Sequence, residues 1–509
     1  MVDEFHKRRF DGLRWRVVYD RYDGVAAFAV DELVKEVQAC QPYVLPVLSC
    51  EQARAAACAE TEHEVLVGLA GRHPGLSRLT DAGLLDVPDD PQGYAVFVGP
   101  HPQREGCRMI AVAGRSEAGL LHGVMDVNAR VFGEHLHTEP QTAARLREDF
   151  DRLPDLRLRE TPAVRRRGIW TWGYVMYDYA RYLDNMARLR MNTLVAWFDH
   201  PPVNAVEVID YAHRRGIDVI AGFHWGWGLT GLELDRPADR RQITEMVLRH
   251  YDEHYARLNV DGLYFQTLTE TSQTRTGGMS VAAAARELVN ETAAVLLDRR
   301  PGMPIYFGLH ATSIASDAHE LAGLDDRVEI MWEDAGGIPY QYIPTLDPAQ
   351  DDGRQLWGER WAVRQQAGQT IEQCTVEYSR QLAEVRPGHE FAMVPKGWCW
   401  IRWDTDFEHH GPMVMGHRRR AWITDRLRER QPRWDQSNAL WIRHLGLAAA
   451  FYRRLLEGGR PMTVAALIED GLLEETIQPG VAILGQTLWN PHRPDADILQ
   501  AAMSRYYKD

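Results

Sequence analysis

Short apolar runs alternate with longer amphipathic segments along most of the chain after Gly168. The runs have the length of buried strands, and the apolar positions of the segments between them recur with the spacing of one helix face. The predicted strands are residues 168–174, 193–199, 218–228, 261–271, 304–310, 327–334 and 390–400. The predicted helices that separate them include residues 179–191, 204–216, 238–258 and 281–300.

This alternation predicts a parallel sheet, because parallel neighbours need a crossover helix between them. Successive units of this kind, without a dinucleotide-binding fingerprint, favour a closed (β/α)8 TIM barrel over an open doubly wound sheet. Residues 480–491 are the candidate for the eighth strand, with a helix as the alternative, and a strong helix is expected before it at 434–458. The predicted fold class is α/β, a TIM barrel preceded by a small α/β domain.

The first part of the chain has the pattern of that small α/β domain. Its predicted elements are strands at 64–70, 94–99 and 108–114 and a helix at 116–133. A polar, proline-containing stretch at 151–168 is interpreted as a linker. The segment after the barrel core is helical, and it completes the barrel, packs on it or forms a homodimer contact. The expected division is 1–155 for the small domain, 156–433 for the barrel core and 434–509 for the helical segment.

Composition narrows the classes of partner. The formal net charge of −14 argues against general nucleic-acid binding and against binding to an anionic membrane surface, because both kinds of binding require a basic patch on the protein. Apolar runs are too short for a membrane span, and the charged start MVDEFHKRRF has no signal-peptide character. The six cysteines form no CxxC pair, so no zinc site, disulfide framework or cofactor is expected. A cytoplasmic location is the resulting expectation.

Carboxylates, histidines and tryptophans follow the predicted barrel strands. Because the carboxyl ends of TIM-barrel strands form the active face, we expect these side chains to share one site. Carboxylates from two strands can flank a glycosidic bond, one as the acid for the leaving oxygen and the other as base or nucleophile. The candidate catalytic residues are Glu270, Glu333 and Asp334. The candidate substrate-binding residues are Trp172, Trp197, Asp199, His224, Trp225, His310, Trp332, Lys396 and Trp398.

Each of these residues has an alternative interpretation. The sixteen tryptophans include candidate platforms for sugar rings, but core packing explains any one of them as well. Glu270 suits a solvated loop or a helix cap, and Asp199, before the turn sequence HPP, suits a cap. Glu333 and Asp334 suit a strand-end turn, and His224 suits a buried hydrogen-bonded histidine. Lys396 and Arg402 could supply the fixed positive charge that a uronic acid requires.

The same pattern leaves three function classes open. The leading hypothesis is an exo-acting glycoside hydrolase whose partner is a carbohydrate. A metal-dependent sugar isomerase or lyase would use strand-end histidines and carboxylates as metal ligands. The loop EHHGP, residues 408–412, is a second candidate metal site, although adjacent loop histidines rarely bind one ion together. A catalytically silent carbohydrate-binding barrel would need the aromatic mouth alone.

Two longer stretches resemble glycoside hydrolases that place a small α/β domain before a catalytic barrel. RMIAVAGRSEAGLLHGVMDV (108–127) is similar to the strand and helix that close their N-terminal domain, and RRRGIWTWGYVMYDYARYLDNMARLRMNTLVAWFDH (165–200) is similar to their barrel entry. GQTLWNP (485–491) resembles the last-strand tryptophan segment of family 20. The resemblance is to family 20 β-N-acetylhexosaminidases, family 84 enzymes and family 67 α-glucuronidases.

The resemblance implies roles for particular residues. The general acid of these families is a Glu after strand four, a place that Glu270 occupies. In family 67 the base carboxylates come from later strands, and Glu333 or Asp334 are the nearest candidates here. Family 20 enzymes carry an Asp directly before the acid, where this chain has Thr269. The implied activity is β-N-acetylhexosaminidase-like, with α-glucuronidase-like hydrolysis of acidic sugars as the alternative.

Overall fold

The chain forms two compact units in the computed structural model, principally Met1–Pro162 and Ala163–Tyr507. The structure describes residues 13–56, 62–133, 143–198, 200–226, 229, 231–267, 269, 273–310, 314, 317–333, 368, 371–399, 401 and 411–506.

The first unit is built on a six-stranded sheet with the order β2-β1-β3-β5-β4-β6. The pairs among β1, β2, β3 and β5 are parallel, whereas β4 pairs antiparallel with β5 and β6. The strands are β1 (Arg14–Tyr19), β2 (Val47–Ser49), β3 (Glu62–Leu69), β4 (Tyr94–Pro100), β5 (Arg108–Gly114) and β6 (Leu156–Glu160). The stretch that was expected to be a linker therefore contains a strand of this sheet, β6, whose alternating Leu and Arg residues half-bury it at the edge.

Helices cover this sheet. The predicted capped helix begins at Glu117, where the Ser116 side chain accepts a hydrogen bond from the backbone N–H of Ala118, and it continues as a π-helical turn. The helical elements are α2 (Gly24–Ala39), α3 (Cys50–Ala55), α4 (Pro74–Asp81), α5 (Glu117–Asp126), the π-helix η1 (Val127–Phe132) and α7 (Ala143–Asp151).

The second unit contains a closed barrel of eight parallel strands, which confirms the predicted TIM barrel. Neighbouring strands pair in the order β7-β8-β9-β10-β13-β14-β15-β17, and β17 pairs with both β15 and β7. The barrel strands are β7 (Arg166–Trp172), β8 (Thr193–Trp197), β9 (Asp218–His224), β10 (Gly262–Gln266), β13 (Ile305–Leu309), β14 (Val328–Trp332), β15 (Phe391–Met393) and β17 (Met462–Glu469). The short strand β16 (Trp398–Cys399) follows β15 in the chain and pairs with the end of β17, at Ile468 and Glu469.

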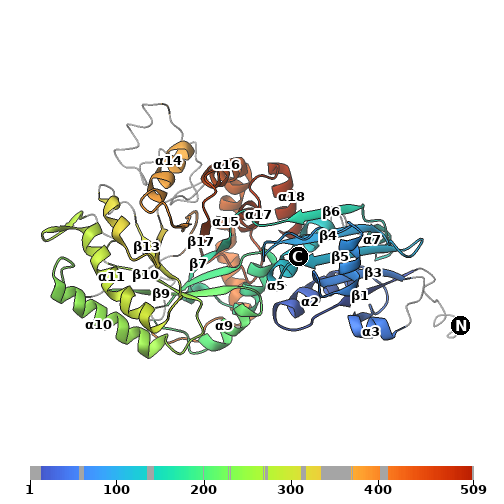
Figure 1. Ribbon diagram of the computed structural model, residues 1–509, viewed down its shortest axis with the longest axis horizontal. Helices are drawn as coiled ribbons and strands as arrows, with labels where there is room; N and C mark the ends of the chain where they lie inside the picture. Colours follow the sequence, from blue (N-terminus) through green and yellow to red (C-terminus); the bar gives the residue numbers. More distant parts are fainter. Residues whose placement is uncertain are drawn as a thin grey trace. The chain divides into compact units, whose positions relative to one another are not determined.

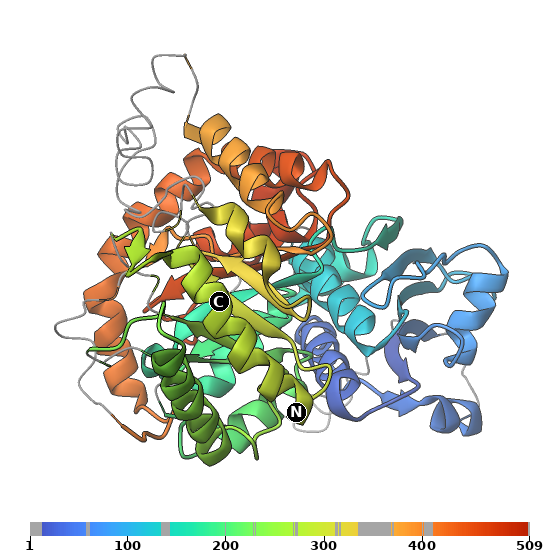
Figure 2. The same ribbon diagram turned by 60° about the vertical axis from the view of Figure 1, so that its left-hand side comes forward.

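Helices follow the barrel strands and lie outside them, as α9, α10 and α11 do in Figure 1 and, from a second direction, in Figure 2. They are α8 (Tyr179–Arg188), α9 (Ala205–His213), α10 (Pro237–His254), α11 (Val281–Arg299), α14 (Ile371–Ala383), α15 (Arg420–Arg443), α16 (Leu445–Leu456), α17 (Pro479–Trp489) and α18 (Asp495–Tyr506). The short elements are the 3-10 turns η2 (Gly173–Val175) and η4 (Ala318–Gly323) and the hairpin strands β11 (Arg275–Thr276) and β12 (Met279–Ser280). Among the described helices, none is both long and apolar enough to span a bilayer.

The eighth strand lies at Met462–Glu469 and not at the candidate position, residues 480–491. That candidate is the helix α17, all of whose residues are buried, so its apolar run carries no periodicity that separates a helix from a strand. Pro479 in the first turn suits a helix start, which supports the alternative interpretation of this segment.

The barrel interior is a packed core. The side chains that fill it include Trp170, Val195, Trp197, Ile220, Tyr264, Tyr306, Met331, Ala392, Val394 and Ala465. Strand spacing around this core depends on small residues at close approaches. A Cβ atom added to Gly168 on β7 would lie 1.6 Å from the backbone carbonyl oxygen of Thr193 on β8.

Gly168→Ala should destabilise the barrel, because neither strand backbone can move away without breaking the ladder that pairs β7 with β8. We expect the free energy of unfolding to fall by about 3 kcal/mol, at the upper end of overpacking effects. Urea denaturation followed by tryptophan fluorescence measures the change. Gly278→Ala is the matched control, since an added Cβ there meets nothing within 4 Å. Equal stability of the two variants would contradict the close approach.

Candidate active site

One inward-facing residue at or just beyond the carboxyl end of each barrel strand forms a set that we call the mouth layer. Successive side chains of a strand alternate between its faces, and seven of the eight members are assigned to the layer because they lie an even number of positions from an interior core residue of their own strand. The eighth, Lys396, follows β15 and is placed by its contact with Glu333. The mouth layer consists of Trp172, Trp197, His224, Gln266, His310, Glu333, Lys396 and Glu469. Trp172, His224 and His310 are partly exposed, and the other five are buried.

Glu333 is a buried carboxylate with several polar partners in the mouth layer. Its Oε2 lies 2.9 Å from His310 Nε2 and 3.4 Å from Lys396 Nζ. Its Oε1 accepts hydrogen bonds from the Tyr264 hydroxyl and the Gln266 amide. A carboxylate offers about four acceptor positions, so these groups from three other strands together saturate it.

The charge state of Glu333 follows from these contacts. Burial alone would raise the pKa of its carboxyl, but the charges of His310 and Lys396 and the hydrogen bonds outweigh burial and hold that pKa far below its usual value. Glu333 is therefore ionised at neutral and at mildly acidic pH. It suits the role of a fixed anion, base or nucleophile and not that of a general acid, which must carry a proton.

Tyr264 reaches Glu333 through space that Gly308 leaves open. A Cβ atom at Gly308 would lie 1.9 Å from the Tyr264 hydroxyl oxygen. The Tyr264 ring packs edge-on against Trp170 and Trp197, with centroids 5.8 and 6.1 Å away. Burial and the neighbouring Glu333 charge raise the pKa of Tyr264 well above 10, so its hydroxyl remains a donor.

Trp172 has a second carboxylate as its partner. Its indole N–H donates to Glu469 at the end of β17, a residue that is 1% exposed. The ring is held edge-on by Trp170 and Trp197 at centroid distances of 5.4 and 5.6 Å. Glu469 is absent from the sequence-based candidates because the eighth strand was expected elsewhere. The run MTVAALIE after the turn residues EGGRP was the signal that could have located it.

The other three tryptophans predicted as sugar platforms lie elsewhere. Trp225 has no exposed surface and stacks on Phe265 at 3.5 Å, and Trp398 is likewise covered and stacks on Trp441 at 4.1 Å. Trp332 is 3% exposed and adjoins the inward-facing Glu333, so it points to the opposite face of β14. The alternative interpretation, core packing, fits the geometry of all three better than a platform role does.

Three predicted site residues, Glu270, Asp334 and Asp199, lie outside the described residues, as do Arg402 and His409 and His410 of the EHHGP stretch. Their roles stay predictions. Of the remaining predicted residues, the structure brings Trp172, Trp197, His224, His310, Glu333 and Lys396 together in the mouth layer.

A further buried acidic group lies in the segment after β17. Glu474 Oε1 accepts hydrogen bonds from the backbone N–H of Tyr177 at 2.6 Å and of Asp178 at 3.4 Å, in the segment after β7. Asp470 accepts the Tyr177 hydroxyl at 2.8 Å and pairs with Arg430 at 2.6 Å. Burial raises the pKa of Glu474 to about 7. Because Glu474 Oε1 accepts hydrogen bonds from this backbone, Glu474 connects the segment after the eighth strand to the segment after the first strand.

Glu333→Gln should be strongly destabilising, because it removes the anion that faces Lys396 and His310 in a buried place. Breaking a buried ion pair costs roughly 3–5 kcal/mol. Since the folded-state pKa is depressed below the usual Glu value of 4.5, this contribution is fully present above that pH and is lost as the pH falls further. Urea denaturation near pH 7 measures it. The control is Glu457→Gln, whose partner is the exposed Arg380, with an expected cost below about 1 kcal/mol. Similar losses in the two variants would contradict the argument.

Glu474→Gln should flatten the pH dependence of stability. The folded state holds a proton on Glu474 that the unfolded chain releases near its usual pKa of 4.5, so wild-type stability falls as the pH rises from there to about 7. Glutamine mimics the protonated form. The variant should therefore gain roughly 3 kcal/mol relative to wild type over this range. Unfolding free energies measured at several pH values test this, and parallel curves for the two proteins would refute it.

Comparisons with known proteins give structural likenesses alone. No protein-family model matches the chain. No curated protein matches it either.

The similar solved structures include CpGH84B, at 11% identity and TM-score 0.49, over 96% of this chain and 70% of that one. A family GH115 4-O-methyl-α-glucuronidase, BtGH115A, is 13% identical with TM-score 0.46, over 94% of this chain and 57% of that one. An O-GlcNAc hydrolase from Thermobaculum terrenum is 11% identical with TM-score 0.40, over 68% and 64% of the two chains. The activities in these names belong to those proteins.

Proposed function

We propose that this chain is an exo-acting glycoside hydrolase. The observation that carries the proposal is the composition of the mouth layer, which joins carboxylates from two strands, Glu333 and Glu469, to a partly exposed Trp172 ring. Sugar rings present C–H faces to aromatic rings, and glycoside cleavage needs two carboxyl groups with different protonation states. The carboxyl ends of TIM-barrel strands are where such sites form.

The proposed division of labour gives the acid role to Glu270. It follows β10, whose inward residues Tyr264 and Gln266 both contact Glu333. The saturated Glu333 carboxylate acts best as the fixed anion that orients His310 and Lys396. That leaves Asp334, the next residue, and Glu469 as the candidates for the second catalytic carboxylate, with Glu333 itself as base or nucleophile if a substrate displaces one of its donors.

The proposed substrate is a terminal β-N-acetylhexosaminide, on the strength of the sequence resemblance. Thr269, which is 2% exposed, stands where family 20 enzymes carry the Asp that orients the acetamido group, so we propose direct acid and base catalysis without that residue. The second candidate is a terminal uronide. Lys396 and the partly exposed His310 favour it, because both supply positive charge or N–H donors at the mouth.

To test Glu270 as the general acid, cleavage rates are measured on a panel of aryl glycosides that includes N-acetylhexosaminides and glucuronides. Each sugar is supplied with two leaving groups, phenol and dinitrophenol. Glu270→Gln should slow cleavage of phenyl glycosides by roughly 100- to 10,000-fold, the range for a general acid. Cleavage of the matching dinitrophenyl glycosides should fall far less, because that leaving group departs without a proton. Glu457→Gln is the control with wild-type rates. Equal losses with both leaving groups would assign Glu270 to another role, and no cleavage of any member by wild type would count against the enzyme class.

A further inference from the structure

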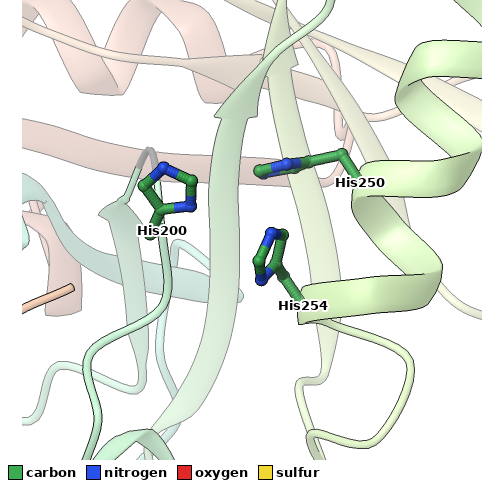
Figure 3. Close-up of side chains that lie close together, drawn as sticks. All are labelled: His200, His250 and His254. Carbon is green, nitrogen blue, oxygen red and sulfur yellow. The ribbon is translucent and has the colours of Figure 1, made fainter. Parts of the chain in front are cut away.

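Three histidines gather outside the mouth layer, on the helix side of the barrel. His250 and His254 lie four positions apart on α10, so they project from the same face of that helix. His200 comes from the segment after β8 and faces them (Figure 3). One ring nitrogen from each histidine lies within 4.8 Å of those of the other two, and all three side chains are partly buried.

The surroundings hold these rings in place. The Tyr255 hydroxyl, just after α10, donates to the Phe198 carbonyl oxygen at 2.8 Å and so fastens α10 to the segment that carries His200. Phe223 stacks on Tyr255 at 4.8 Å and contacts the His250 ring at 5.3 Å, which gives the cluster an apolar wall. The Glu253 carboxylate lies 4.0 Å from His254 Nε2.

This arrangement matches the needs of a transition metal. Zinc binds imidazole nitrogens at about 2.0–2.1 Å in tetrahedral geometry, which separates ligand atoms by roughly 3.4 Å. The three nitrogens already lie within 4.8 Å of one another and have to close to that separation when they bind one ion. Three imidazoles suit zinc, copper, nickel or cobalt, whereas calcium and magnesium prefer oxygen ligands.

We propose that His200, His250 and His254 bind one divalent transition metal ion of the zinc class, with solvent as the fourth ligand. The ion clamps the segment after β8 to the end of α10. The site is independent of the proposed hydrolase activity, because none of its ligands belongs to the mouth layer. The sequence signal was the pair HYDEH, two histidines at helical spacing, but the third ligand lies 50 positions earlier and only the fold brings it near.

The test is a titration of the chelator-treated, dialysed full chain with cobalt(II), read by visible absorption, followed by displacement with zinc. Wild type should bind one equivalent with the absorption of a tetrahedral site. The variants His254→Ala and His200→Asn should each weaken binding by at least about 10-fold. His319→Ala, at an exposed histidine outside the cluster, should leave it unchanged.

Thermal unfolding provides a second readout, because a ligand that binds only the folded state raises the midpoint. Zinc should raise the unfolding midpoint of wild type and of His319→Ala but not that of His200→Asn. His200 lies in a connecting segment, and circular dichroism can confirm that the His200→Asn variant is folded. Binding of no ion by wild type would overturn the proposal. Undiminished binding by the cluster variants would overturn it equally, since the ion would then sit elsewhere.

Discussion

The pairing of β17 with β7 on one side and β15 on the other is the constraint on which the second unit depends. A closed parallel barrel has no free edge, and it directs alternate side chains of every strand to one shared interior. Mostly apolar side chains fill that interior up to the mouth layer, and Trp197 belongs to both. Closure also explains how Trp172 and Glu469, 297 positions apart, meet as donor and acceptor.

The charge of Glu333 is the second organising feature. A carboxylate taken out of water is costly unless donors and cations replace its hydration. Here β10 supplies Tyr264 and Gln266, and His310 and Lys396 follow β13 and β15. One buried anion thereby fixes the relative positions of groups from four strands. These contacts hold His310 and Lys396 in defined orientations at the mouth.

The two faces of the strands carry different chemistry. Inward positions hold the mouth layer, whereas outward positions such as Phe223 pack against the helices and border the three-histidine cluster. Neighbouring residues therefore cannot share a role. His224 faces inward, and Trp225 stacks on Phe265 outside; Glu333 faces inward, and Trp332 packs outward. Strand alternation could have made this distinction from the sequence, since it requires only the parity of each position within its strand.

The sequence by itself determined the fold class, seven of the barrel strands and the strand ends at which Glu333, His310 and Lys396 occur, because strand and helix periodicities are local properties. It did not locate the eighth strand, because the fully apolar α17 has no periodicity and resembles a buried strand. It also could not show that Glu333 is saturated by donors, that Glu469 holds Trp172, or that His200 lies beside α10. Those facts depend on contacts between distant segments, and only barrel closure and helix packing bring such segments together.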